Sequence, residues 1–427
     1  MKYEKRVFKN GLRAIVTPME NTETAMLLVL VGTGSRYEDR NINGISHFLE
    51  HLFFKGTKKR PNPGQIHSAL DKIGAIHNAF TTKEFTGFWV KTAAADFDIG
   101  LDVVSDILLE PIFKKEEIEK ERGVIFQEKN MIEDTPQARA GEILENVLYG
   151  DAPLGWNIIG NNDSLKKIQR EQIIRYLKDH YVGSNAIVVA AGNIDANKTF
   201  SKLEKSFRLM PKGEIKPRNE ADDLQENFQI KLVEKKTDQM HFAMGLRAYN
   251  MFDEKKYALN LLSVILGGNA SSRLFMEIRE KLGLAYYVGS GGEQYTDVGY
   301  LSIGAGVPHD ALQKVLEKIA EIIGKIKEKG ISEKELKNAK SFARGRFALS
   351  LESSDEVAMF LGEQELLLRK ILQPEEILKK IEKVSRNDIM KAGTDVFNSS
   401  KSNLVAIGQH QDIKAKEQLY KKIFNKI

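Results

Sequence analysis

The chain has 427 residues, more than one compact core usually holds, so its length predicts two to four domains. Its hydrophobic fraction of 42%, charged fraction of 29% and net charge of +5 are those of a soluble globular protein, and no basic block predicts a nucleic-acid partner. The absence of cysteine excludes disulfides and thiolate metal ligands, and no run approaches the roughly 18–20 apolar residues of a membrane span. Because the N-terminus also lacks the apolar run of a signal peptide, we expect a cytoplasmic protein with no membrane partner.

The first half of the chain alternates short apolar runs with longer helical patterns. The run AMLLVLVGTG at 25–34 ends in glycines, as a buried strand often does. A helix is predicted to follow from about Gly44, with Asn43 as its N-cap. Further helices are predicted at 62–74, 96–111 and 114–134, and further strands at 85–92 and 186–195.

The second half repeats this pattern after a polar, charged segment at 216–226, which we interpret as a linker. The helical segment that starts at Ile331 can be laid over the one that starts at Phe113, an offset of 218 residues and about half of the chain. The repeat predicts two similar α+β halves, at 1–215 and 227–427. In the second half, strands are predicted at 241–246 and 298–306, and helices at 253–268, 311–330 and 331–349.

The predicted helix in NGISHFLEHLFF carries two histidines and a carboxylate in close spacing. At about 100° per residue, His47, Glu50 and His51 lie within about 100° of one another, and the apolar residues cluster on the opposite side. Two histidines at i and i+4 can share a tetrahedral Zn²⁺, and a carboxylate beside them can take a proton from water that the metal activates. The HxxEH order therefore predicts a hydrolytic zinc site rather than two surface histidines.

A catalytic zinc needs a third protein ligand, which the predicted helix at 114–134 can supply. Glu121 and Glu128 are seven residues apart, two helical turns, so both lie on one face. Spacing alone does not choose between them, and a solvated acidic helix is the structural alternative. We interpret the isolated His67, His180 and His410 as structural, and the spacing of His77 gives it no part in the site.

Four stretches of the chain together resemble a known family. GSRYED, NGISHFLEHLFFKGTKKRP, NAFTTKEFTGF and ERGVIFQEK are similar to segments of the pitrilysin or insulinase-type zinc peptidases, also called inverzincins. The nearest likeness is to bacterial two-domain members, which are similar to mitochondrial processing peptidase subunits. The resemblance covers nearly the whole chain. It implies two α/β-sandwich halves, each a mainly antiparallel sheet packed by helices, that together form half of a clam-shell.

The resemblance also implies roles for the residues of the first half. His47, His51 and Glu128 would bind zinc, Glu50 would be the general base, and Glu121 would be a supporting carboxylate. In the segment NAFT, Asn78, Ala79 and Phe80 would belong to an edge strand that meets the substrate.

The second half matches the family in SSRLFMEIREKLGLAYYVGS, which puts Arg279 and Tyr286 in the roles of substrate and oxyanion contacts. The second half has no matching ligand set at the positions 218 residues after His47, Glu50, His51 and Glu128. One Zn²⁺ per chain is therefore expected.

Together, these implications predict that the chain is a zinc-dependent endopeptidase that acts on short or unfolded peptides. The family resemblance further implies a homodimer with a composite active site. The alternatives are a non-catalytic scaffold or peptide-binding subunit, and a subunit of a presequence-processing peptidase.

Overall fold

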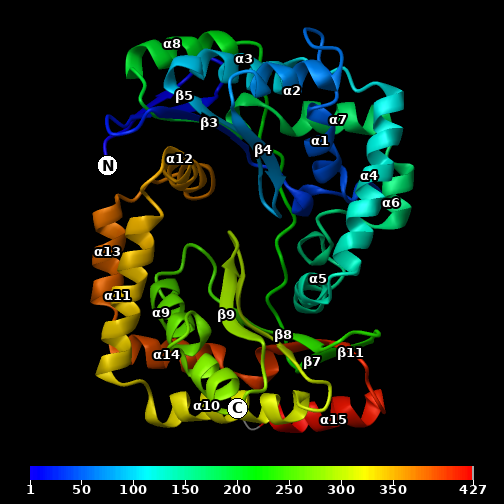
Figure 1. Ribbon diagram of the computed structural model, residues 1–427, viewed down its shortest axis with the longest axis vertical. Helices are drawn as coiled ribbons and strands as arrows, with labels where there is room; N and C mark the ends of the chain where they lie inside the picture. The colour runs from blue at the N-terminus through cyan, green and yellow to red at the C-terminus, as the bar shows by residue number, and fades with distance from the viewer. Residues whose placement is uncertain (426–427) are drawn as a thin grey trace. The chain divides into compact units, whose positions relative to one another are not determined.

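The computed structural model describes residues 1–425, which fold into two compact units (Figure 1). Both units are discontinuous in sequence, whereas the predicted division into 1–215 and 227–427 treats each half as continuous. Within the described residues, no helix combines the length and the apolar character needed to cross a membrane. The first unit comprises 1–129, 156–219 and 347–373, and the second comprises 130–155, 220–346 and the chain from 374 onward.

The first unit is built on a six-stranded sheet in the order β1-β2-β6-β3-β5-β4, in which β4 is a terminal strand. The pairings are antiparallel except between β2 and β6. The central β3 is buried along almost its whole length, because helices cover both faces of the sheet. The strands are β1 (Glu4–Val7), β2 (Arg13–Pro18), β3 (Thr24–Val31), β4 (Ile76–Thr81), β5 (Thr86–Ala93) and β6 (Ala186–Gly192).

Several helices of the first unit pack directly against this sheet. Helix α3 lies against β5 and helix α8 against β2, while α12 lies against β3 and β6 (Figure 1). These helices are α1 (Ile45–Phe53), α2 (Pro63–Asp71), α3 (Phe97–Leu109), most of α4 (Lys115–Glu133), α6 (Asn162–Lys167), α7 (Arg170–His180), α8 (Ala196–Ser206) and α12 (Ser354–Glu363).

The second unit repeats this sheet. Its order, β7-β11-β8-β10-β9, matches β2-β6-β3-β5-β4 strand for strand, and again one pairing, β7 with β11, is parallel. The predicted fold of two similar α+β halves is thus confirmed. Helix α11 (Glu333–Leu349) starts 218 residues after α4, as the sequence offset predicts. The strands are β7 (Gln229–Glu234), β8 (Met240–Ala248), β9 (Tyr287–Gln294), β10 (Gly299–Val307) and β11 (Ser402–Gly408).

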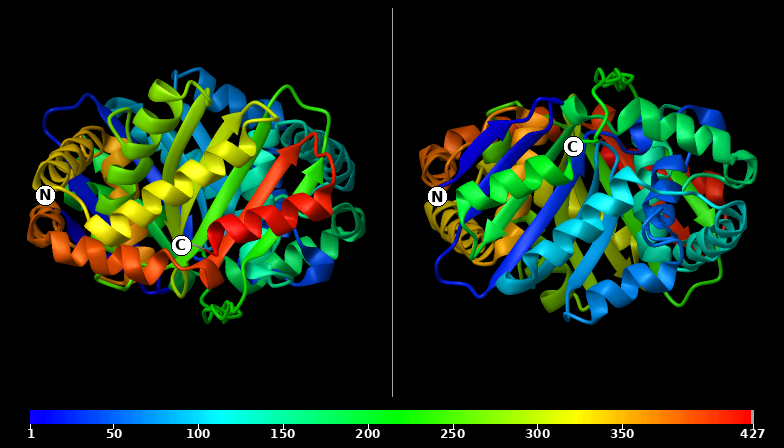
Figure 2. Two further views of the ribbon diagram at one scale, coloured as in Figure 1. Left: turned by 90° about the horizontal axis from the view of Figure 1, so that it is seen from below. Right: turned by 90° about the horizontal axis from the view of Figure 1, so that it is seen from above.

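Helices α10 and α15 lie across the strands of the second sheet, as α3 and α8 lie across the first (Figure 2). Arg279 belongs to a π-helix at Phe275–Lys281. Such helices are rare in proteins, and those that occur are often at functional sites. The α-helices of the second unit, besides most of α11, are α5 (Pro136–Tyr149), α9 (Lys256–Gly267), α10 (Leu312–Lys329), α13 (Pro374–Lys383), α14 (Arg386–Val396) and α15 (Ile413–Phe424).

Each sheet takes one covering helix from the other half of the sequence. Helix α12 packs Val357 and Leu361 into the core on β3 and β6 of the first sheet. Helix α5 packs Leu144 and Leu148 against β8 and β11 of the second sheet, where Gly245 leaves room for both side chains. The exchange buries apolar faces that would otherwise be exposed, and it explains why each unit is assembled from separate segments.

Candidate metal centre

Helix α1 presents the HxxEH residues from a buried position. Its apolar side chains Phe48, Leu49 and Leu52 are buried in the first unit. His47 is 8% exposed, and Glu50 and His51 are partly buried. The helical spacing predicted from sequence is therefore realised, with the three ionisable groups on one helix of nine residues.

Glu38 fixes the start of this helix, a role that sequence analysis assigned to Asn43. The Glu38 carboxylate accepts hydrogen bonds from the backbone N–H groups of Gly44 at 2.7 Å and Ser46 at 2.8 Å. The side chain of Asn43 caps no backbone N–H group of the helix, and donates instead to the same carboxylate. Gly44 precedes the helix with φ 97°, a conformation that favours glycine. Glu38 lies within the stretch GSRYED, but nothing in its spacing indicates a cap six residues away.

Replacing Glu38 by glutamine is expected to destabilise the fold and to change its pH dependence. Glutamine places an NH₂ donor group where the second oxygen of Glu38 faces N–H donors, so the free energy of unfolding at pH 5 should fall by about 1–3 kcal/mol. Burial, opposed by the hydrogen bonds from Gly44, Ser46 and Asn43, raises the pKa of Glu38 from 4.5 to about 7. The folded state thus binds this proton more tightly than the unfolded state does. The resulting stability is present below pH 4.5 and is lost as the pH rises through about 7.

Urea unfolding at pH 5 and pH 7.5 measures both effects of this substitution. The wild-type free energy should decline between these values by more than that of Glu38→Gln. Glu116→Gln, which changes an exposed carboxylate, is the matched control. Parallel pH profiles of wild type and Glu38→Gln would contradict the role of Glu38 as the buried cap.

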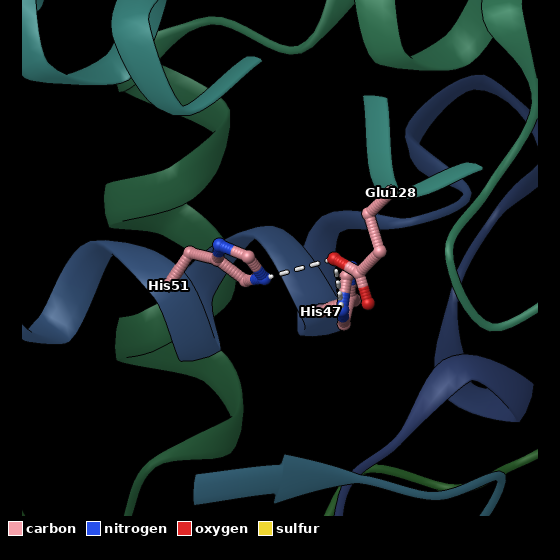
Figure 3. A group of neighbouring side chains, drawn as sticks. All are labelled: His47, His51 and Glu128. Carbon is pink, nitrogen blue, oxygen red and sulfur yellow. Dashed lines mark ion pairs between the residues drawn. The ribbon is translucent and has the colours of Figure 1, made fainter. Parts of the chain in front are cut away.

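Helix α4 brings Glu128 to the two histidines (Figure 3). Glu128 Oε2 lies 3.6 Å from His47 Nε2 and 3.4 Å from His51 Nε2. Hydrogen bonds with His47 and then His51 hold the pKa of Glu128 far below its usual range, so this carboxylate is ionised. Among the residues that the structure describes, this is the one group of three or more potential ligands whose donor atoms all lie within 4.8 Å of one another.

This geometry fits a zinc ion. Tetrahedral ligands at about 2.1 Å from the metal lie about 3.4 Å apart, close to the two separations of Glu128 Oε2 from the imidazole nitrogens. Two imidazoles and a carboxylate are also a donor set that zinc prefers and that leaves a fourth position for water. The residues present therefore suit a catalytic zinc site.

Glu121 lies behind His51 and away from the shared donor group. Its Oε2 is 3.2 Å from His51 Nδ1, and its Oε1 is 2.9 Å from Lys55 Nζ. A carboxylate on Nδ1 leaves Nε2 of the same ring free for a metal. Burial alone would lower the pKa of His51, but hydrogen bonds with Glu121 and Glu128 raise it to about 9. The surrounding carboxylates thus favour a positive charge at His51. A bound metal ion would supply this charge in place of the proton.

Strand β4 lies beside Glu50. The Thr81 hydroxyl donates a 2.7 Å hydrogen bond to Glu50 Oε2, a contact that sequence analysis missed although Thr81 closes the segment NAFT. Of the predicted substrate contacts on β4, Asn78 is exposed, Ala79 is buried, and Phe80 is half-buried against Phe85. Only Asn78 has a freely exposed side chain.

Arg279 and Tyr286 belong to the second unit, and the structure brings them together there. The Arg279 guanidinium lies 5.9 Å from the centre of the Tyr286 ring and 4.9 Å from that of Phe275. Tyr286 is 77% exposed, an unusual state for a large aromatic side chain. The predicted site residues therefore form two groups, the HxxEH–glutamate group of the first unit and the Arg–Tyr pair of the second.

Two family profiles match consecutive parts of the chain. The family profile described as "Insulinase (Peptidase family M16)" matches residues 14–162, and the one described as "Peptidase M16 inactive domain" matches residues 167–342. An uncharacterized zinc protease of Bacillus subtilis is 36% identical over 91% of this chain and 94% of its own length. One from Streptomyces coelicolor is 31% identical over 95% of this chain and 89% of its own length.

A solved protease structure from Helicobacter pylori is similar in fold, with a TM-score of 0.89 and 26% identity over 95% of this chain and 99% of its own. A structure from Pseudomonas fluorescens titled as a peptidase M16 inactive domain also has a TM-score of 0.89, over 96% of this chain and 98% of its own. At 18% identity, that likeness concerns the fold alone. From the profile matches and the zinc-protease relatives, the chain belongs to the insulinase family of peptidases, family M16.

Proposed function

We propose that the chain is a zinc-dependent endopeptidase that cleaves short or unfolded peptides. The observation that carries this proposal is the convergence of His47, His51 and Glu128 to within 4.8 Å, with Glu50 on the same helix as the histidines. Relatives named as zinc proteases support the choice of metal and of reaction class.

The chain's own residues divide the work of hydrolysis. His47, His51 and Glu128 would hold zinc, which supplies polarisation of the peptide carbonyl and activation of water. Glu50 accepts a proton from the attacking water and returns it to the leaving amine. Thr81 holds the Glu50 carboxylate in place through its 2.7 Å hydrogen bond, and Glu121 orients the His51 ring.

The substrate adds to the first sheet as a further strand along β4. This strand is at one end of the sheet and pairs only with β5 among the described strands, so its other edge presents backbone N–H and C=O groups. Because Ala79 is buried and Phe80 is half-buried, we propose that they contribute through their backbone, while Asn78 adds an exposed amide. Recognition of this kind depends on an extended substrate more than on its sequence.

Arg279 and Tyr286 complete the proposed machinery. Arg279 would hold a substrate carbonyl, and the exposed Tyr286 hydroxyl would donate a hydrogen bond to the oxyanion as it forms. The family resemblance implies a homodimer, in which this pair of one chain acts on the metal centre of the other.

The alternative of a non-catalytic subunit is less well supported. A scaffold has no need of a complete metal set, yet all three donors and the adjacent Glu50 are present. The match to an inactive domain covers 167–342, which contains none of these four residues. The match to the peptidase domain covers all four.

Digestion of a mixed peptide library with and without a chelator tests the proposal. We expect cleavage by the purified chain, read by mass spectrometry, its loss on zinc removal and its return when zinc is added back. Unchanged peptides in the presence of one bound zinc per chain would favour the non-catalytic alternative. Cleavage that persists after complete metal removal would exclude the zinc mechanism.

A further inference from the structure

Two other histidines of the first unit face each other at one end of β4. His67 on α2 and His77 on β4 have ring centres 5.8 Å apart, with 38° between the ring planes. Phe54, directly after α1, lies 6.3 Å from the His67 ring and 6.1 Å from the His77 ring. Sequence analysis interpreted His67 as structural and gave His77 no part in the first site; ten residues separate the two, and the fold brings them together.

The separation of these rings is close to that of two imidazoles on one metal ion. With zinc–nitrogen bonds of about 2.1 Å and a tetrahedral angle, the centres of two ligating rings lie about 5.2 Å apart. The rings of His47 and His51 in the first site are 4.7 Å apart. The 5.8 Å separation of the His67 and His77 rings is thus about 0.6 Å longer than this geometry requires.

A carboxylate stands beside this pair. Asp71 follows His67 by four residues on α2, so the two side chains project from the same face of the helix. Burial lowers the pKa of His77, and the neighbouring His67 lowers it further, while the charge of Asp71 and a hydrogen bond with the backbone of Ala75 oppose the shift. His77 is therefore neutral at pH 7, the form in which an imidazole binds a metal.

We propose that His67, His77 and Asp71 form a second site for a borderline divalent cation such as Zn²⁺, Cu²⁺ or Ni²⁺. Two imidazoles and one carboxylate are the donors that such ions prefer. The site is weaker than the first, because its three donor atoms do not lie within 4.8 Å of one another before the ion binds. We therefore expect the second site to need a higher concentration of free metal than the first.

This second site has a consequence that rests on the proposed function. His77 directly precedes Asn78 on the free-edge strand, so an ion between α2 and β4 fixes the end of the strand where a peptide would add. We expect occupancy of the second site to change KM for a peptide more than kcat, because the ion lies beside the peptide-binding strand and shares no ligand with the first site.

Metal binding itself is tested without any activity. Untagged protein loaded with one equivalent of Zn²⁺ is dialysed against rising Zn²⁺, and bound metal is counted by mass spectrometry. We expect a second equivalent in the wild type, and an affinity for it that is lower by at least about tenfold in His67→Gln and in His77→Gln. His410→Gln, which removes a half-buried histidine of the second unit, is the matched control and should retain both ions.

A further variant separates the two sites. Glu128→Gln should lose the first ion and keep the second, because the second site shares no ligand with the first. Circular dichroism of each variant checks that the fold is intact. The proposal is overturned if the wild type binds only one ion, or if folded His67→Gln and His77→Gln bind the second ion as the wild type does. Neither outcome depends on whether the chain cleaves peptides.

Discussion

Replacing Glu50 by glutamine is expected to lower kcat/KM for a peptide substrate by about 10²–10⁴-fold while zinc content stays at that of the wild type. Glutamine is nearly the same size, and its carbonyl oxygen can still accept the 2.7 Å hydrogen bond from Thr81. It cannot take a proton from water, so the substitution removes the general base and leaves the architecture of the site in place. Steady-state kinetics and metal analysis on the same preparation measure both parts.

The matched control for Glu50→Gln is Glu116→Gln, an exposed carboxylate at the start of α4 that should leave the kinetics unchanged. A Glu50→Gln variant that holds zinc and retains more than about a tenth of the wild-type kcat/KM would show that another group is the base. Loss of activity together with loss of zinc would point instead to a structural effect of the substitution.

The same variant tests the homodimer that the family resemblance implies. Chains with Glu50→Gln keep Arg279 and Tyr286, whereas chains with Tyr286→Phe keep Glu50. If the Arg–Tyr pair acts across two chains, mixed dimers recover activity that neither variant has alone. No recovery in mixtures that demonstrably exchange subunits would argue that each chain uses its own pair.

Substitution of Glu121 and Glu128 on α4 is expected to distinguish the third zinc ligand from the carboxylate that supports it. Glu128→Gln should abolish retention of zinc in the first site after dialysis, because Glu128 Oε2 is the oxygen shared with His47 Nε2 and His51 Nε2. Glu121→Gln should weaken zinc binding by about 10–100-fold, the usual cost of losing a carboxylate that orients a ligating histidine. Competition with a zinc chelator of known affinity measures both.

The order of these two effects decides the assignment. If Glu121→Gln loses zinc completely and Glu128→Gln only weakens it, then Glu121 is the ligand and Glu128 the supporting carboxylate. Glu116→Gln again serves as the control, because it changes a carboxylate of the same helix away from both histidines and should leave zinc affinity unchanged.

Much of the first site could be predicted because it depends on local geometry. A helix places residues i, i+3 and i+4 on one face whatever it packs against, so HxxEH indicated two ligands and a base before any fold was known. The same rule put Glu121 and Glu128 together but could not rank them, since both lie on one face of α4. The family resemblance implied Glu128 as the ligand, and the packing of α4 places Glu128 beside both histidines and Glu121 on the Nδ1 side of His51.

Contacts between segments far apart in the chain could not be predicted from the sequence pattern. Glu38 caps α1 across a loop, and Thr81 holds Glu50 from another element, at separations that no periodicity encodes. The exchange of α5 and α12 between the two sheets was missed for the same reason, because an amphipathic helix does not specify which apolar face will cover it.

The sequence by itself determined the α+β pattern of each half, the helix that carries HxxEH and the choice of family, since each depends on motifs of residues close along the chain. The tertiary structure decided which glutamate faces the histidines, which helix covers which sheet, and that His67 and His77 meet beside β4. The physical reason is that side-chain direction along one element follows from backbone geometry, whereas contact between elements follows from the burial of whole apolar faces.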